Sequence, residues 1–115
     1  MDLRDFEEVV DQAVAELPAE FRARIANIEV LIEETPDRET RRRFPGLLLG
    51  LYRGVPLTER SVMAPPAPDL IFLYKKNLER ISRGDPDELR RQIVLTIRHE
   101  LGHYFGLDEE DLEDV

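Results

Sequence analysis

The stretch DPDELRRQIVLTIRHELGHYFG, residues 85–106, carries the strongest helix signal in the chain and decides the fold. Asp85 suits the N-cap, Pro86 suits the first helical position, and Glu88 completes a capping box. Gly106 is suited to end the helix. Apolar side chains recur at three- and four-residue spacing in Leu89, Ile93, Ile97, Leu101 and Tyr104. The sequence therefore predicts a long amphipathic C-terminal helix with one buried stripe.

Both histidines of the chain lie away from that stripe. At about 100° per residue, His99 and His103 fall roughly 200° to 240° from Ile97, one turn apart. Thr96 and Gln92 extend the same face. Core packing therefore does not account for the two histidines.

The spacing of His99, Glu100 and His103 gives the pattern H-E-x-x-H. Imidazoles at i and i+4 can bind one ion, and zinc accepts His nitrogen at about 2.0–2.1 Å in tetrahedral geometry. A catalytic site has three protein ligands and leaves the fourth place to a water, whose pKa the metal lowers toward about 7. The glutamate of the motif is a general base, not a ligand. We therefore predict Zn²⁺ bound by His99 and His103, with Glu100 as general base.

A third ligand is expected shortly after the second histidine. Gly106 allows a sharp turn, and the residue three positions further on, Glu109, can then swing back to the metal. Its neighbour Asp108 is the alternative, although Asp108 also suits the N-cap of a short terminal helix over residues 108–115. We expect Glu109 to be the ligand.

Composition limits the class of protein. The chain has 115 residues, 42% hydrophobic and 36% charged, which predicts one globular domain over residues 1–115. The absence of cysteine excludes disulfides and thiolate ligands. A net charge of −9 argues against a nucleic-acid partner. There is no basic, apolar leader and no apolar run long enough for a membrane span, so we expect a cytoplasmic protein with no membrane partner. A homodimer remains open.

The rest of the chain alternates between helix and strand signals. A helix is predicted over residues 3–17, followed by a short helical turn with Pro18 at its first position. Gly50 and Gly54 indicate a bulge or a close backbone approach. Period-two or continuous apolar patterns predict three strands, over residues 27–34, 47–55 and 70–76, the last covered on both faces. Polar or proline-rich connections are expected at residues 35–46, with one helical turn, and at residues 63–69.

The motif from His99 to Gly106, HELGHYFG, resembles that of the small bacterial zincin-like metallopeptidase family, the mini-zincins formerly classed as a domain of unknown function. Their pattern is H-E-x-x-H-x-x-G-x-x-D. GLYRGVPLTERS (50–61) and PDLIFLYKKNLE (68–79) resemble the family's central strands, so the resemblance covers nearly the whole chain. It implies an α+β zincin-like fold, with a small twisted mixed sheet packed against helices and the motif helix facing the cleft. It also implies zinc ligation through the two histidines. Where the family has aspartate as third ligand, this chain has Glu109.

These features predict a zinc-dependent metallopeptidase that hydrolyses peptide bonds of a peptide or protein substrate with zinc-bound water. An exposed edge strand, LLLGLYRG (47–54), would hold an extended substrate by backbone pairing. Tyr104 and Tyr74 are the candidate oxyanion donors. One alternative is a zincin-fold protein with weak or no hydrolysis that binds a peptide or partner. A further alternative is an acidic α+β domain whose histidines only form hydrogen bonds near a helix end and which binds no zinc.

Overall fold

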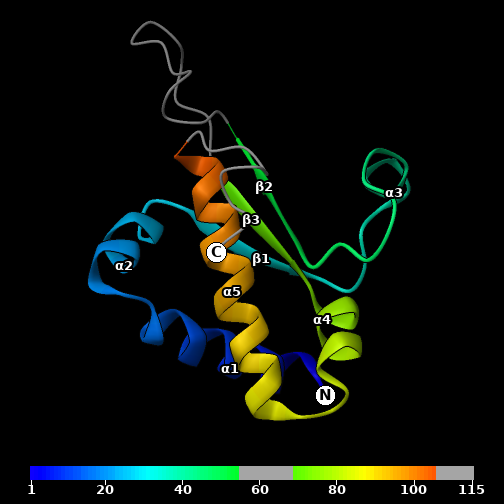
Figure 1. Ribbon diagram of the computed structural model, residues 1–115, viewed down its shortest axis with the longest axis horizontal. Helices are drawn as coiled ribbons and strands as arrows, with labels where there is room; N and C mark the ends of the chain where they lie inside the picture. Colours follow the sequence, from blue (N-terminus) through cyan, green and yellow to red (C-terminus); the bar gives the residue numbers. More distant parts are fainter. Residues whose placement is uncertain (55–68, 106–115) are drawn as a thin grey trace, which may run out of the picture.

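The computed structural model describes residues 1–54 and 69–105, and it has the predicted α+β architecture (Figure 1). Predictions for the loop at residues 63–68 and for Gly106, Asp108, Glu109 and the terminal helix lie outside the described residues. In chain order the elements are α1 (Leu3–Glu16), α2 (Ala19–Ile25), β1 (Glu29–Glu33), α3 (Arg38–Arg43), β2 (Gly50–Arg53), β3 (Leu70–Tyr74), α4 (Lys75–Ser82) and α5 (Pro86–Tyr104).

The three strands form one mixed sheet in the order β1-β3-β2. Strand β1 runs parallel to β3, and β2 runs antiparallel to it. The central place of β3 explains why its sequence is apolar at every position, since both of its faces are covered. Ile71 and Leu73 point into the main core, whereas Phe72 and Tyr74 are buried on the other face. The prediction of a strand covered on both sides is confirmed.

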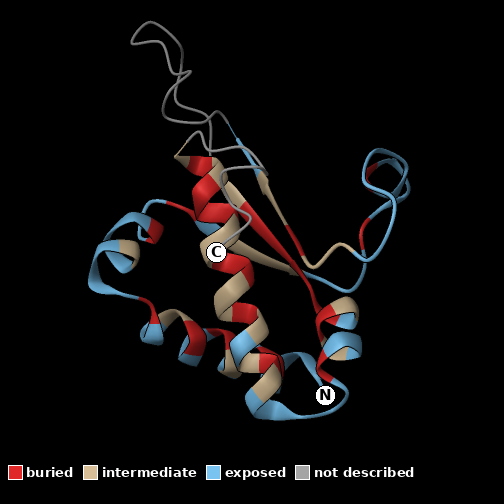
Figure 2. Ribbon diagram, in the orientation of Figure 1, coloured by how far each residue is buried: buried red, intermediate tan, exposed pale blue. Residues whose placement is uncertain are grey.

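Helix α5 lies across the sheet and contacts α1, α4 and β2 (Figure 1). Buried residues recur along its length, as Figure 2 shows. The predicted buried stripe is confirmed, because each of its members belongs to the core: Leu89, Ile93, Ile97, Leu101 and Tyr104. The contacts of α5 with β2 come from Thr96 and Glu100, which lie beside this stripe, and from Tyr104 within it.

The start of α5 has the predicted cap but not the full capping box. The carboxylate of Asp85 accepts hydrogen bonds from the N–H groups of Asp87 and Glu88, at 3.0 and 3.4 Å. The Glu88 carboxylate does not reach back to complete the box. It binds the Arg91 guanidinium at 2.8 and 3.0 Å and the Gln92 amide at 2.9 Å. These contacts, Arg91 first, lower the pKa of Glu88 to about 2.

Two local predictions need correction. The third strand ends at Tyr74, and Lys75 already belongs to helix α4, for which the sequence has no N-cap signal. The Lys75 ammonium binds Glu79 one helical turn later, at 2.8 Å, which favours the helical conformation at this point. Pro18 is the N-cap of α2 rather than its first residue.

Candidate metal centre

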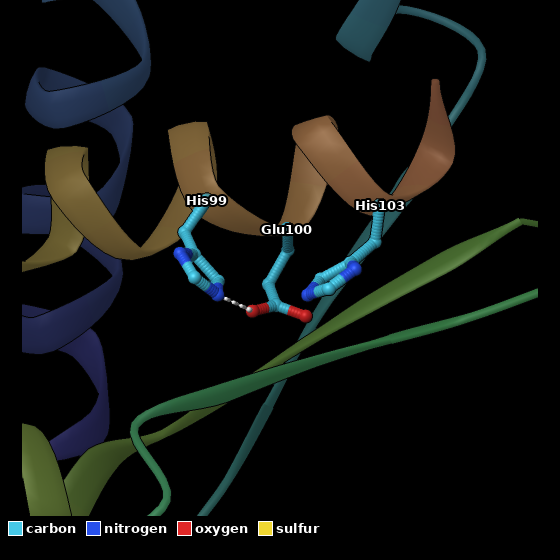
Figure 3. Close-up of side chains that lie close together, drawn as sticks. All are labelled: His99, Glu100 and His103. Carbon is cyan, nitrogen blue, oxygen red and sulfur yellow. Dashed lines mark ion pairs between the residues drawn. The ribbon is translucent and has the colours of Figure 1, made fainter. Parts of the chain in front are cut away.

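Helix α5 places His99, Glu100 and His103 on the face that it turns toward β2 (Figure 3). Their potential ligand atoms all lie within 4.8 Å of one another. The imidazole rings are 5.1 Å apart between centroids and steeply inclined, at 77°. Both histidines are half-buried, whereas Glu100 is only 6% exposed. The three residues that the motif singled out therefore form one compact cluster.

This cluster suits zinc. In tetrahedral geometry with bonds of about 2.0–2.1 Å, two ligand nitrogens lie about 3.3 Å apart. The spacing within the cluster is close enough that side-chain rotation alone could bring both imidazoles to one ion. Imidazole nitrogen and carboxylate oxygen are donor types that zinc commonly accepts. Glu109 and Asp108, from which a third protein ligand is expected, lie outside the described residues.

The carboxylate of Glu100 is held by the neighbouring strand. Its Oε1 accepts a hydrogen bond of 2.7 Å from the backbone N–H of Tyr52 in β2. Its Oε2 lies 4.0 Å from Nε2 of His99. A short hydrogen bond to a buried carboxylate is among the stronger ones in proteins and restricts its rotation. Glu100 is therefore oriented between the two imidazoles, as Figure 3 shows.

The side chain of Tyr52 is fixed in turn. Its hydroxyl donates to Oδ1 of Asp69 at 2.8 Å, and its ring packs edge-on against Tyr104 of α5, with 5.9 Å between centroids. Asp69 is buried, and a Cβ on Gly54 would collide with its Oδ1, so Gly54 gives the predicted close approach. Sequence reasoning missed Tyr52 and Asp69, because no residue type marks a backbone donor, and Asp69 resembles an ordinary loop carboxylate.

Gly50 explains how α5 comes so close to β2. A Cβ at this position would lie 2.5 Å from Cγ2 of Thr96 and 2.9 Å from the carbonyl oxygen of Phe72. It would also lie 3.7 Å from Cγ of Glu100. The predicted close backbone approach at Gly50 is confirmed, and it brings the helix near enough for the Tyr52–Glu100 hydrogen bond.

The two tyrosines considered as oxyanion donors lie in different surroundings. Tyr74 alternates with Leu73, so its phenol lies on the face of the sheet opposite α5. Burial raises the pKa of Tyr74, which keeps the phenol neutral. Tyr104 belongs to the core stripe of α5 and packs against Tyr52.

Comparison with known protein families agrees with this geometry. The model of a family described as zincin-like metallopeptidase matches residues 25–115. No curated protein matches the chain. Among residues 1–54 and 69–105, no helix combines the length and apolar character needed to cross a membrane. The family implies a metal, typically zinc, and a peptide or protein substrate. The match spans most of the chain and includes the histidine–glutamate cluster, and the chain therefore belongs to the zincin-like metallopeptidase family.

Proposed function

We propose that residues 1–115 form one zincin-like domain that hydrolyses peptide bonds with the help of zinc. One observation carries the proposal: His99, Glu100 and His103 converge beside the edge strand β2. A cluster that only stored or buried a metal would not need a carboxylate held by a backbone donor beside the two imidazoles. The family match supports the same reading.

In this proposal His99 and His103 hold the zinc through their ring nitrogens, and Glu109 is the third ligand, with Asp108 as the alternative. When bound, zinc acidifies a water molecule and polarises the carbonyl group that the water attacks. The half-buried position of the histidines leaves the cluster accessible from one side. A substrate can therefore approach along β2.

Glu100 supplies the proton transfers. The N–H of Tyr52 holds Oε1 in place, and Oε2 lies on the side of His99, 4.0 Å from its Nε2 (Figure 3). Glu100 accepts a proton from the attacking water at Oε2 and then donates it to the nitrogen of the leaving amine. Because Oε1 is fixed, the carboxylate does not have to be ordered again at each turnover.

The test is zinc calorimetry at about pH 7.5, because zinc binds the neutral form of imidazole and its affinity falls in acid. We expect one zinc per chain in the wild type and no binding in His103→Ala. Glu109→Ala should weaken binding, whereas Asp108→Ala, the matched control, should not. Glu100→Gln should bind zinc normally but lose cleavage of a peptide library by at least a hundredfold.

The same experiment separates the alternatives. If zinc binds and the wild type cleaves no faster than Glu100→Gln, the chain is a zincin-fold binding protein rather than a peptidase. The alternative is included because this chain has Glu109 at the position where the family pattern has aspartate as third ligand. If zinc at millimolar concentration does not bind, the histidines have no metal role and the proposal fails.

A further inference from the structure

A groove lies between α1 and the edge strand β1, and its volume is about 550 Å³. Its surface is mostly apolar and is formed by buried and half-buried side chains: Val10, Val14, Ile25, Ile28, Val30 and Ile32. None of the described residues that line it belongs to α5 or β2. This groove is therefore separate from the proposed catalytic centre.

The rim of the groove carries charge of one sign. Glu7 and Asp11 are exposed, lie one helical turn apart on α1, and are the charged residues among the described residues that line it. Among residues 1–54 and 69–105, no ion pair joins either carboxylate to a basic group. Like charges at this spacing destabilise a helix, so a cation at the rim would be favourable. The groove therefore suits an apolar side chain that has positive charge beside it.

The chain itself presents such a surface at the end of α3. We call it the basic surface, and it consists of Arg41, Arg42, Arg43, Phe44 and Leu47. Phe44 and Leu47 are 39% and 45% exposed, although both are large and apolar. The guanidinium group of Arg43 lies over the ring of Phe44, 5.7 Å from its centroid. An exposed aromatic ring and three cations are thus held together on a protein whose net charge is −9.

The basic surface cannot fill the groove of its own chain in this fold. Figure 1 shows α3 well apart from α1, and Figure 2 shows that α3 is largely exposed. The short helix is also fixed, because the Asp37 carboxylate accepts a hydrogen bond of 2.8 Å from the N–H of Thr40, which is buried. A second copy of the chain can therefore receive a surface that is already formed, which limits the ordering that binding requires.

A symmetric contact between two grooves is disfavoured. Placing one groove against another would bring Glu7 and Asp11 of both copies together. Pairing the two β1 edges antiparallel about Leu31 would place Glu29 of one copy opposite Glu33 of the second copy, and like charges directly opposite are destabilising. Charge complementarity instead matches the groove of one copy with the basic surface of the next.

We propose that the groove of one copy binds the basic surface of a second copy, with Phe44 inside it and the arginines beside Glu7 and Asp11. Phe44 then loses apolar surface to water, and the guanidinium groups face the two carboxylates. Because the two contacting surfaces differ, a dimer retains one free groove and one free basic surface, so the assembly can grow head to tail. The contact is small, and we expect it to be weak and reversible.

Sedimentation of the full chain from micromolar to millimolar concentration tests the proposal. The mass of the wild type should rise with concentration and pass that of a dimer. Glu7→Lys and Phe44→Ser should each weaken association by about tenfold or more. The matched controls are Glu8→Lys, next to Glu7 but outside the groove, and Ile81→Ser, whose side chain is 40% exposed on α4. Both controls should associate like the wild type.

A mixture shows whether the two surfaces bind each other. Glu7→Lys keeps its basic surface and Phe44→Ser keeps its groove, so together they should form a dimer of one copy each that does not grow. Arg42→Glu with Arg43→Glu replaces Phe44→Ser if that variant does not fold. Within one chain, adding Arg43→Glu to Glu7→Lys exchanges the charges and should restore association.

Three results would overturn the inference, and none of them depends on zinc binding or peptide cleavage. The first is a wild type that stays monomeric at millimolar concentration. The second is equal association of Glu7→Lys and Glu8→Lys. The third is a mass that stops at the dimer together with a mixture of folded variants that does not assemble, which would indicate a symmetric contact elsewhere.

Discussion

Replacing Gly50 with alanine should loosen the contact between β2 and α5. The added Cβ would meet Cγ2 of Thr96 at 2.5 Å and the carbonyl oxygen of Phe72 at 2.9 Å, both too close for ordinary contact. Gly50 does not have a positive φ, so alanine meets a steric obstacle rather than backbone strain. Overpacking of this kind typically costs about 1–3 kcal/mol. We expect a loss of that size in the free energy of unfolding, and a fall in Tm of roughly 4 to 12 °C.

Urea denaturation of four proteins tests the stated cause: wild type, Gly50→Ala, Thr96→Ser and the double variant. Thr96→Ser removes the methyl group that obstructs the new Cβ and alone should cost about 1 kcal/mol. The double variant should be more stable than the sum of the two losses predicts, by about 1 kcal/mol. Rescue is partial because the contact with the oxygen of Phe72 remains.

Gly46→Ala provides the control for this cycle. A Cβ at Gly46 meets nothing within 4 Å, but its φ is +106°, so alanine there costs backbone strain of about 1 kcal/mol. That loss should add to the loss from Thr96→Ser without coupling. The reasoning is refuted if Gly50→Ala is as stable as the wild type, or if its coupling with Thr96→Ser is no larger than that of Gly46→Ala.

Two other predictions concern the carboxylates of α5. Because the N–H of Tyr52 points away from β3, Tyr52→Pro removes the donor to Glu100 without removing a hydrogen bond of the sheet. The kcat of Tyr52→Pro for peptide cleavage should be at least tenfold lower than that of Tyr52→Ala, whereas the two variants should bind zinc with equal affinity. Equal kcat values would contradict the role of the Tyr52 N–H in orienting Glu100. Glu88 has a folded-state pKa of about 2, below its usual value of about 4.3, so its contacts stabilise the fold above about pH 4.3, and this stabilisation is lost as pH falls through 2. The unfolding free energy of the wild type should therefore decrease more steeply between pH 5 and pH 2 than that of Glu88→Gln, and parallel pH profiles would show that Arg91 and Gln92 do not stabilise the charged form.

The features predicted correctly from the sequence are those fixed by local geometry. The Asp85 N-cap and the apolar period of residues 85–104 define α5 and its two faces without reference to the rest of the chain. The four-residue spacing that joins His99 to His103 is also a property of one helix, so their meeting follows from the sequence. The glycines at 50 and 54 indicated close approaches, although not which residues would approach.

The features that could not be predicted from the sequence either depend on contacts between residues distant in the chain or have only weak local signals. Helix α4 follows β3 without a side-chain cap, so its start at Lys75 has no sequence signature. The donor to Glu100 is a backbone group 48 positions earlier, and only the register of β2 determines that it faces the helix. The place of Asp69 beneath Tyr52 depends on the same register.

The edge strand β2 and the proposed general base, Glu100, are directly connected by a hydrogen bond. Strand β2 is paired with β3 on one side, and on its other side the N–H of Tyr52 binds Glu100. Glycine at position 50 is thus a condition both for the packing of α5 on the sheet and for the orientation of Glu100. Gly50→Ala should therefore change the environment of the Glu100 carboxylate, which the amide proton shift of Tyr52 reports directly, even at temperatures where the variant remains folded.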